Sequence, residues 1–127
     1  MSAQMVLVAE DDEDILDLVE LCLQQAGYEV VTARDGEEAL RLAGERRPAL
    51  ALLDVQMPKT NGYEVTRRLR ADAATRSMAI IILTASVRDT ELARAFDAGA
   101  DDFLRKPFSP SDLAARVRAA LESEARL

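Results

Sequence analysis

Short apolar blocks alternate with longer amphipathic segments along the whole chain. The apolar blocks are either continuously hydrophobic or rich in β-branched residues, and both patterns favour β-strands. They cover residues 5–9, 28–33, 49–53, 78–83 and 102–104. Between them, hydrophobic residues recur at the three- and four-residue spacing of a helix that buries one face. In the first such segment they are Ile15, Leu18, Val19, Cys22, Leu23 and Ala26. The pattern therefore predicts five strands, each followed by a helix.

Local signals indicate where these helices begin and end. Small polar residues, some followed three positions later by a glutamate, are typical of helix N-caps. The expected N-caps are Asp35, Asn61, Ser86 and Ser109, the last followed by Pro110 in the first helical turn. Gly27 and Gly99 are expected to end the first and fourth helices, because glycine adopts the left-handed conformation of a helix C-terminus at low cost.

Strands that alternate with helices predict a parallel sheet, because parallel neighbours need a crossover connection. Right-handed crossovers with helices on both faces make such a sheet doubly wound. We therefore expect an α/β fold: a single (βα)5 flavodoxin-like domain with its five strands in the order 2-1-3-4-5. In that order the first and third strands flank the topological switch point, and ligands bind there at the carboxyl ends of the strands.

Charge and hydropathy exclude several classes of partner. The formal net charge is −7, so we expect no direct contact with nucleic acid. No segment approaches the roughly 18–20 apolar residues of a membrane span, and no secretory signal is recognisable, so we expect no membrane contact and a cytoplasmic location. The single cysteine, Cys22, fits a reducing compartment and is expected to be a small buried hydrophobe rather than a reactive thiol.

Histidine is absent from the chain. Its absence excludes a Ser-His-Asp or Cys-His nucleophile and a histidine-ligated zinc site. General acid–base chemistry near neutral pH would fall to carboxylates, lysine or tyrosine. If a phosphohistidine takes part in the chemistry, another protein must supply it. A dinucleotide-binding role is also excluded, because no GxGxxG motif follows the first strand and the chain contains no P-loop.

Polar or small residues follow four of the predicted strands. They are Glu10 and Asp11 after residues 5–9, Asp54 after 49–53, Thr84 and Ala85 after 78–83, and Lys106 after 102–104. The carboxyl ends of parallel strands meet at one edge of a sheet, so these side chains are expected to converge.

Three carboxylates in one pocket repel one another. Two charges about 4 Å apart cost about 4 kcal/mol at an effective dielectric of about 20. Protonation, Lys106 or a divalent cation must offset this cost. Because the candidate ligands are all oxygens, Mg²⁺ is the expected cation. Lys106 is also expected to pair with Asp54.

Four segments resemble the receiver domain of two-component response regulators. They are VLVAEDD at 6–12, LLDVQMP at 52–58 with NG at 61–62, ILTA at 82–85, and GADDFLRKPF at 99–108. The resemblance extends from about residue 5 to residue 121. It implies one receiver domain over residues 1–127 with no output domain in this chain, acting as a signalling module rather than as an enzyme that turns over an external substrate.

The resemblance also implies roles for the acidic residues. Asp54 would be the nucleophile that takes a phosphoryl group from the phosphohistidine of a sensor histidine kinase or a histidine phosphotransfer protein. Asp11, Asp54 and the backbone carbonyl of Gln56 would ligate Mg²⁺, and Glu10 would act mostly through a bound water. Glu10 stands where aspartate is commoner in the family, and its extra methylene should still reach that water.

The remaining site residues would hold the phosphoryl group and transmit its presence. Thr84 and Lys106 would contact the phosphoryl oxygens, Ala85 would leave room for them, and the bond from Lys106 to Pro107 is expected to be cis. In the family, an aromatic residue moves toward the threonine and changes the surface that a downstream effector protein recognises. That surface comprises the fourth helix, fifth strand and fifth helix. Here the aromatic is Phe103, which lacks a ring hydroxyl, so packing in the core is the expected role and switching stays open.

Alternative interpretations remain at this point. A phosphohydrolase of the haloacid-dehalogenase type also uses an aspartyl nucleophile on a parallel sheet, but it needs a second acid where this chain has Gln56. A receiver-like scaffold could bind partners without phosphorylation. Glu10, Asp11 and Asp12 could simply cap the first helix, where negative charge is favourable. The oligomeric state is left open by the sequence.

Overall fold

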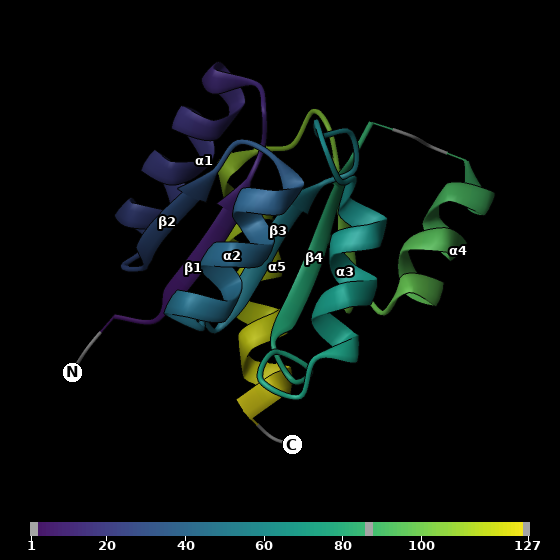
Figure 1. Ribbon diagram of the computed structural model, residues 1–127. Helices are drawn as coiled ribbons and strands as arrows, with labels where there is room; N and C mark the ends of the chain where they lie inside the picture. The colour runs from purple at the N-terminus through teal and green to yellow at the C-terminus, as the bar shows by residue number, and fades with distance from the viewer. Residues whose placement is uncertain (1–2, 86–87, 126–127) are drawn as a thin grey trace.

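The computed structural model describes residues 3–85 and 88–125, and within them five parallel strands form one sheet in the order β2-β1-β3-β4-β5 (Figure 1). The strands are β1 Met5–Ala9, β2 Glu29–Ala33, β3 Leu50–Asp54, β4 Ala79–Thr84 and β5 Asp102–Arg105. The helices are α1 Glu13–Gln25, α2 Gly36–Arg46, α3 Gly62–Ala71, α4 Asp89–Ala98 and α5 Pro110–Ala125. The predicted doubly wound (βα)5 fold and its strand order are confirmed.

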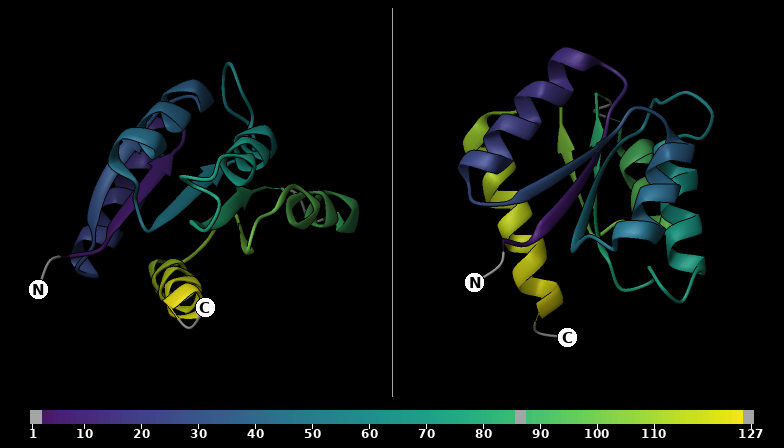
Figure 2. Two further views of the ribbon diagram at one scale, coloured as in Figure 1. Left: turned by 60° about the horizontal axis from the view of Figure 1, so that its bottom comes forward. Right: turned by 60° about the vertical axis from the view of Figure 1, so that its left-hand side comes forward.

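The burial of each strand explains its sequence pattern. Every residue of β3 and β4 is buried, because helices cover both faces of these central strands. The edge strand β2 has only its last residue, Ala33, fully buried. Figure 2 shows α1 and α5 on one face of the sheet and α2, α3 and α4 on the other. Cys22 is half-buried and packs against the core on the α1 and α5 face.

Side-chain caps fix the starts of most of the helices. Asp35, Asn61 and Ser109 each accept a hydrogen bond from the backbone N–H three residues later, as predicted. At α1 the cap is Asp12, which accepts from Asp14 and Ile15 at 3.0 and 3.3 Å. The capping alternative therefore holds for Asp12.

At α4, the predicted cap Ser86 lies outside the described residues. The helix itself begins at Asp89. It ends, as predicted, at Gly99, whose φ of 113° is left-handed.

No helix in the described ranges, 3–85 and 88–125, is long and apolar enough to cross a lipid bilayer.

Gly62 lets α3 approach the end of β3 closely. A Cβ atom at this position would lie 2.4 Å from the backbone oxygen of Asp54, a fixed atom that cannot move aside. The Gly62 N–H also donates to the carbonyl of Val55 at 3.0 Å. The glycine therefore sets the path of the backbone directly after Asp54.

Substitution of Gly62 by alanine should be destabilising for this reason. We expect Gly62→Ala to lower the free energy of unfolding by about 2 kcal/mol, because the added methyl overlaps backbone. Gly44→Ala is the matched control: it lies inside α2, its Cβ would meet nothing within 4 Å, and it should stabilise by about 0.5–1 kcal/mol. Urea unfolding of both variants measures the difference, and equal midpoints would contradict the steric argument.

Candidate functional site

Three carboxylates meet at the carboxyl end of the sheet. Glu10 and Asp11 directly follow β1, and Asp54 is the last residue of the neighbouring strand β3. One carboxylate oxygen from each residue lies within 4.8 Å of the others. Glu10 is 1% exposed and Asp54 is 5% exposed, whereas Asp11 is open to solvent. The structure therefore brings these three acids together, with one side of the cluster accessible.

Lys106 supplies the opposing charge. Its Nζ donates to Glu10 Oε1 at 2.6 Å and to Asp54 Oδ1 at 2.8 Å. The Lys106 backbone N–H donates to the Thr84 carbonyl at 2.8 Å, so the end of β4 holds the lysine backbone. The Lys106–Pro107 bond is cis, as expected. The sequence predicted the pairing with Asp54 but not the second ion pair with Glu10.

These contacts determine the charge states of the pair. Burial raises the pKa of Glu10, and the hydrogen bond from Lys106 opposes this shift only in part. Burial alone would lower the pKa of Lys106, but its hydrogen bonds to Asp54 and Glu10 outweigh burial and leave that pKa above its ordinary value. Lys106 is therefore cationic at neutral pH and offsets part of the repulsion among the acids.

A pocket of 510 Å³ opens over this cluster. The predicted residues Gln56, Thr84 and Ala85 also line it, so the pocket gathers all the residues singled out for acceptor chemistry. The sequence did not single out two further lining residues, Arg88 and Glu91, which the start of α4 contributes. Their positions depend on the packing of one helix against another, for which the hydrophobic pattern gives no signal.

The predicted aromatic residue lies outside this pocket lining. Phe103 is half-buried and packs against the core on the α2, α3 and α4 face. Its ring meets that of Phe96 edge-on, with the ring centroids 5.9 Å apart. This contact links β5 to α4. Whether Phe103 moves during signalling stays a prediction.

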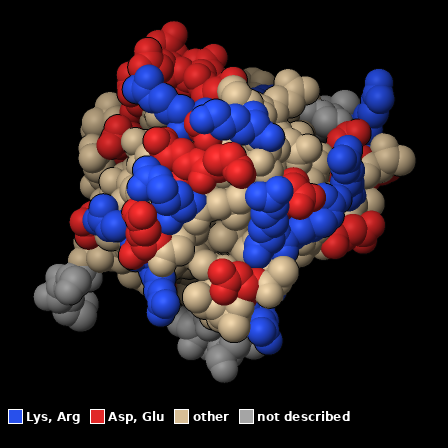
Figure 3. Space-filling view, viewed as in Figure 1, with Lys and Arg blue, Asp and Glu red and all other residues tan. Residues whose placement is uncertain are grey.

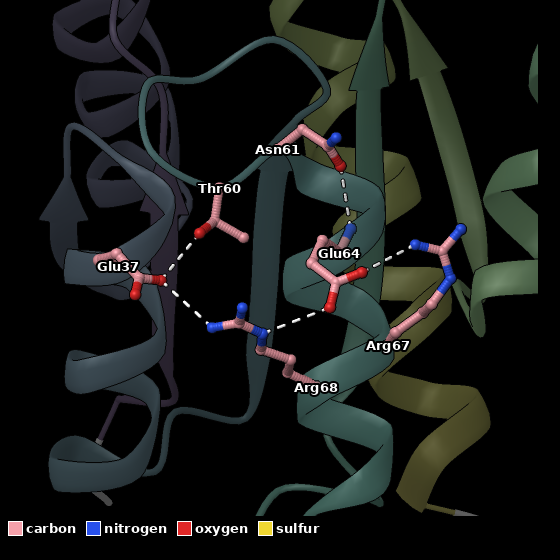
Figure 4. Close-up of polar contacts among 6 residues, drawn as sticks. All are labelled: Glu37, Thr60, Asn61, Glu64, Arg67 and Arg68. Atoms are coloured by element: carbon pink, nitrogen blue, oxygen red, sulfur yellow. Dashed lines mark hydrogen bonds and ion pairs between the residues drawn. The ribbon is translucent and has the colours of Figure 1, made fainter.

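Hydrogen bonds to α2 and α3 hold the end of the β3–α3 loop that precedes α3 (Figure 4). Thr60 donates its hydroxyl to Glu37 of α2 at 2.8 Å, and Asn61 caps α3 through the Glu64 N–H. Arg68 then bridges Glu37 and Glu64 at 3.4 and 3.3 Å. These contacts tie the segment that follows Asp54 to two helices. These contacts therefore hold the backbone that follows Asp54.

Charged side chains of both signs are mixed on the face that carries α2, α3 and α4 (Figure 3). The network around Arg68 is one example, since each arginine there lies beside a glutamate. Among the described residues, this face shows no continuous basic patch.

The acidic cluster fits a hard divalent cation. Its donors are all carboxylate oxygens, and the exposed Asp11 leaves a route of entry. One oxygen from each of the three acids lies within 4.8 Å of the others, so a single cation would be near all of them. The cluster could therefore hold such an ion.

Comparison with known proteins assigns the chain and its fold to a family. The family described as "Response regulator receiver domain" matches residues 6–118. The chain is 42% identical over 116 residues to the alkaline phosphatase synthesis transcriptional regulatory protein PhoP of Bacillus subtilis, covering 91% of this chain and 48% of that protein. It is 41% identical to the DNA-binding dual master transcriptional regulator RpaA of Synechocystis, over 96% of this chain and 51% of that protein. The chain thus spans about half the length of these curated relatives.

Solved structures agree with this assignment. A putative response regulator from Chloroflexus aurantiacus superposes with a TM-score of 0.92 at 36% identity, covering 95% of this chain and 99% of that one. The receiver domain of sensor histidine kinase PA1611 from Pseudomonas aeruginosa, solved with a magnesium ion in its active site cleft, gives a TM-score of 0.89 at 31% identity, with 95% and 99% coverage. With the family match over most of its length, the chain belongs to the response regulator receiver domains of two-component signalling.

Proposed function

We propose that this chain is a phosphoacceptor module of a two-component phosphorelay, and that Asp54 is the residue that takes the phosphoryl group. The donor would be the phosphohistidine of a sensor histidine kinase or a histidine phosphotransfer protein. One observation carries the proposal: the buried Asp54 carboxylate lies 2.8 Å from the Lys106 ammonium, in a pocket that three acids share. The chain would act as a signalling module rather than as an enzyme with an external substrate.

The proposed transfer uses groups that the pocket already positions. An Asp54 carboxylate oxygen attacks phosphorus, the phosphorus–nitrogen bond breaks, and its electron pair stays on the donor imidazole. Lys106 then exchanges its contact with Asp54 for one with the phosphoryl oxygens. Thr84 offers its hydroxyl from the end of β4, and the small side chain of Ala85 leaves space beside it.

A divalent cation completes the proposed charge balance. Asp11, Asp54 and the backbone carbonyl of Gln56 would hold Mg²⁺, with Glu10 acting through a bound water. The bound cation supplies positive charge that offsets repulsion between these acids and an incoming phosphoryl group.

The proposed output is a shift between two packings of the same fold. The phosphoryl group would draw the Thr84 hydroxyl toward it, and Phe103 would follow into the space left behind. The surface of α4, β5 and α5 would then favour a downstream effector protein. We place this module in the cytoplasm, without direct binding to nucleic acid or membrane, and we leave its oligomeric state open.

Metal-dependent uptake of a phosphoryl group tests the proposal. Incubation with phosphoramidate and Mg²⁺, followed by intact mass spectrometry, should add one phosphoryl group to the wild type. Asp11→Asn should slow the initial rate on the order of 100-fold, because it removes a proposed metal ligand. Asp17→Asn removes an exposed acid on α1 and should leave the rate unchanged. The absence of an adduct on the wild type with Mg²⁺ would overturn the proposal.

The phosphohydrolase alternative lacks a needed group. The position of its second acid is held by Gln56, which lines the pocket but cannot exchange a proton near neutral pH. Multiple-turnover hydrolysis of an external phosphoester would be the result in its favour.

A further inference from the structure

A buried tyrosine holds the start of α4 against α3. Tyr63 is 2% exposed, and its hydroxyl donates to Glu91 Oε2 at 2.9 Å. The guanidinium of Arg94 lies over the same ring, with its Cζ 4.5 Å from the ring centroid. Burial, together with the hydrogen bond to Glu91, raises the pKa of Tyr63 to about 12. The hydroxyl therefore stays protonated and remains a donor to Glu91 at any ordinary pH.

This contact matters because α4 buries only small side chains among its described residues. Its buried residues are only Ala95 and Ala98, both small. The large Phe96 is 47% exposed and touches the body through the edge of Phe103. Figure 2 shows α4 projecting from the rest of the fold. The hydrogen bond between Tyr63 and Glu91 thus adds a polar contact between α4 and α3.

Glu91 also faces the acceptor pocket. Arg88, Glu91 and Arg94 are spaced by three residues and so lie on one side of the helix. Glu91 lines both the 510 Å³ pocket over Asp54 and an adjoining pocket of 600 Å³. Tyr63 and Arg94 line only the second of these two pockets. Glu91 therefore lies at the boundary between the two pockets.

The electrostatic setting of Glu91 differs from that of the acids beneath it. Glu10 and Asp54 share the cation Lys106, whereas the described hydrogen bond to the Glu91 carboxylate comes from a neutral hydroxyl. Arg88 lines the same pocket and moderates the local potential. The negative charge of a pocket carboxylate repels an incoming phosphate more strongly as that phosphate becomes more negative.

We propose that Glu91, positioned by the Tyr63 hydroxyl, selects among phosphodonors by charge and disfavours the more negatively charged ones. This inference rests on the proposed role of Asp54 as acceptor. A phosphohistidine whose ring is protonated carries one negative charge fewer than an acyl phosphate dianion. It releases neutral imidazole when the phosphorus–nitrogen bond breaks, whereas an acyl phosphate releases a carboxylate. Glu91 would therefore favour transfer from a protein phosphohistidine over transfer from small acyl phosphates.

Two small donors of different charge separate this effect from a structural one. Phosphoramidate is a monoanion at neutral pH and acetyl phosphate is a dianion. Glu91→Gln keeps the shape and the hydrogen-bond acceptor but removes the charge. We expect it to raise the ratio of the acetyl phosphate rate to the phosphoramidate rate about threefold. High salt should shrink this change, because it screens the carboxylate.

Asp97→Asn is the matched control. It removes the same charge from an exposed position on the same helix and lines neither of these two pockets. Its donor ratio should equal that of the wild type. A Glu91→Gln variant that changes both donor rates by the same factor, or a ratio that salt does not affect, would overturn the inference.

Tyr63→Phe tests the positioning step. It keeps the buried ring and the Arg94 contact but removes the hydroxyl that holds Glu91. We expect it to change the donor ratio in the wild-type background and to have no effect on the ratio in the Glu91→Gln background. Equal effects in both backgrounds would show that Tyr63 does not act through Glu91. If the wild type took phosphate from neither donor, the proposed function itself would fail, which is a different result from an unchanged ratio.

Discussion

Asp54→Asn is expected to abolish uptake of the phosphoryl group while the fold stays intact. An amide oxygen is too weak a nucleophile to form the acyl phosphate. Among the described carboxylates of the pocket, Lys106 pairs only with Asp54 and Glu10. The asparagine oxygen can still accept the hydrogen bond from Lys106, so the free energy of unfolding should change by less than about 1 kcal/mol. Intact mass after incubation with phosphoramidate and Mg²⁺ measures uptake, and urea unfolding measures stability.

Asp17→Asn serves as the control for this experiment, because it makes the same chemical change at an exposed site on α1. It should take up phosphate like the wild type. A full adduct on Asp54→Asn would place the acceptor elsewhere and would contradict the account.

Lys106→Met is expected to cause a large loss of stability in the absence of metal. It leaves the carboxylate of Glu10, 1% exposed, and that of Asp54 buried without their cation. Removing one partner of a buried ion pair costs about 3–5 kcal/mol. Because the Lys106 side chain is 20% exposed, we expect about 2–3 kcal/mol by urea unfolding at neutral pH.

Lys59→Met is the matched control for this substitution. Lys59 is paired with Asp35 at 3.6 Å, but its side chain is 65% exposed. Exposed ion pairs contribute little, so its loss should cost less than about 1 kcal/mol. If the two variants lost similar amounts of unfolding free energy, burial would not explain the stabilising effect of Lys106.

The cost of Lys106→Met should also depend on pH. An acid whose pKa is raised by folding binds protons more readily in the folded state, so its stability contribution improves as pH falls through that pKa. Loss of the lysine hydrogen bond raises the pKa of Glu10 further. The difference in unfolding free energy between the wild type and Lys106→Met should therefore shrink as pH falls below neutral. The wild type, in contrast, should lose the lysine contribution as pH rises above 10.5, the ordinary lysine value. A difference in unfolding free energy that stays constant with pH would contradict this interpretation.

The sequence predicted the fold because its patterns were strong and local. Continuous apolarity over residues 49–53 and 78–83 indicated strands that are covered on both faces, and both are fully buried. The polar residues that end those strands, Asp54 and Thr84, could then be placed at one edge by topology alone. The gathering of the acids and Lys106 followed from the same argument.

Other features depend on side-chain reach and on helix packing, which no periodic pattern encodes. Glu10 and Lys106 are 96 residues apart, and their ion pair depends on how far a glutamate extends from the end of β1. The contact between Tyr63 and Glu91 joins two helices whose relative position the sequence does not indicate. Both contacts therefore became visible only in the structure.

The chemical identity of the phosphorylated residue tests the central claim most directly. The wild type would be incubated with phosphoramidate and Mg²⁺, reduced with borohydride to trap an acyl phosphate as an alcohol, and digested for peptide sequencing by mass spectrometry. The account predicts conversion of Asp54, with Asp11 and Glu10 unmodified. Conversion of a different residue, or a phosphoryl group that resists borohydride because it sits on a serine or threonine hydroxyl, would contradict it.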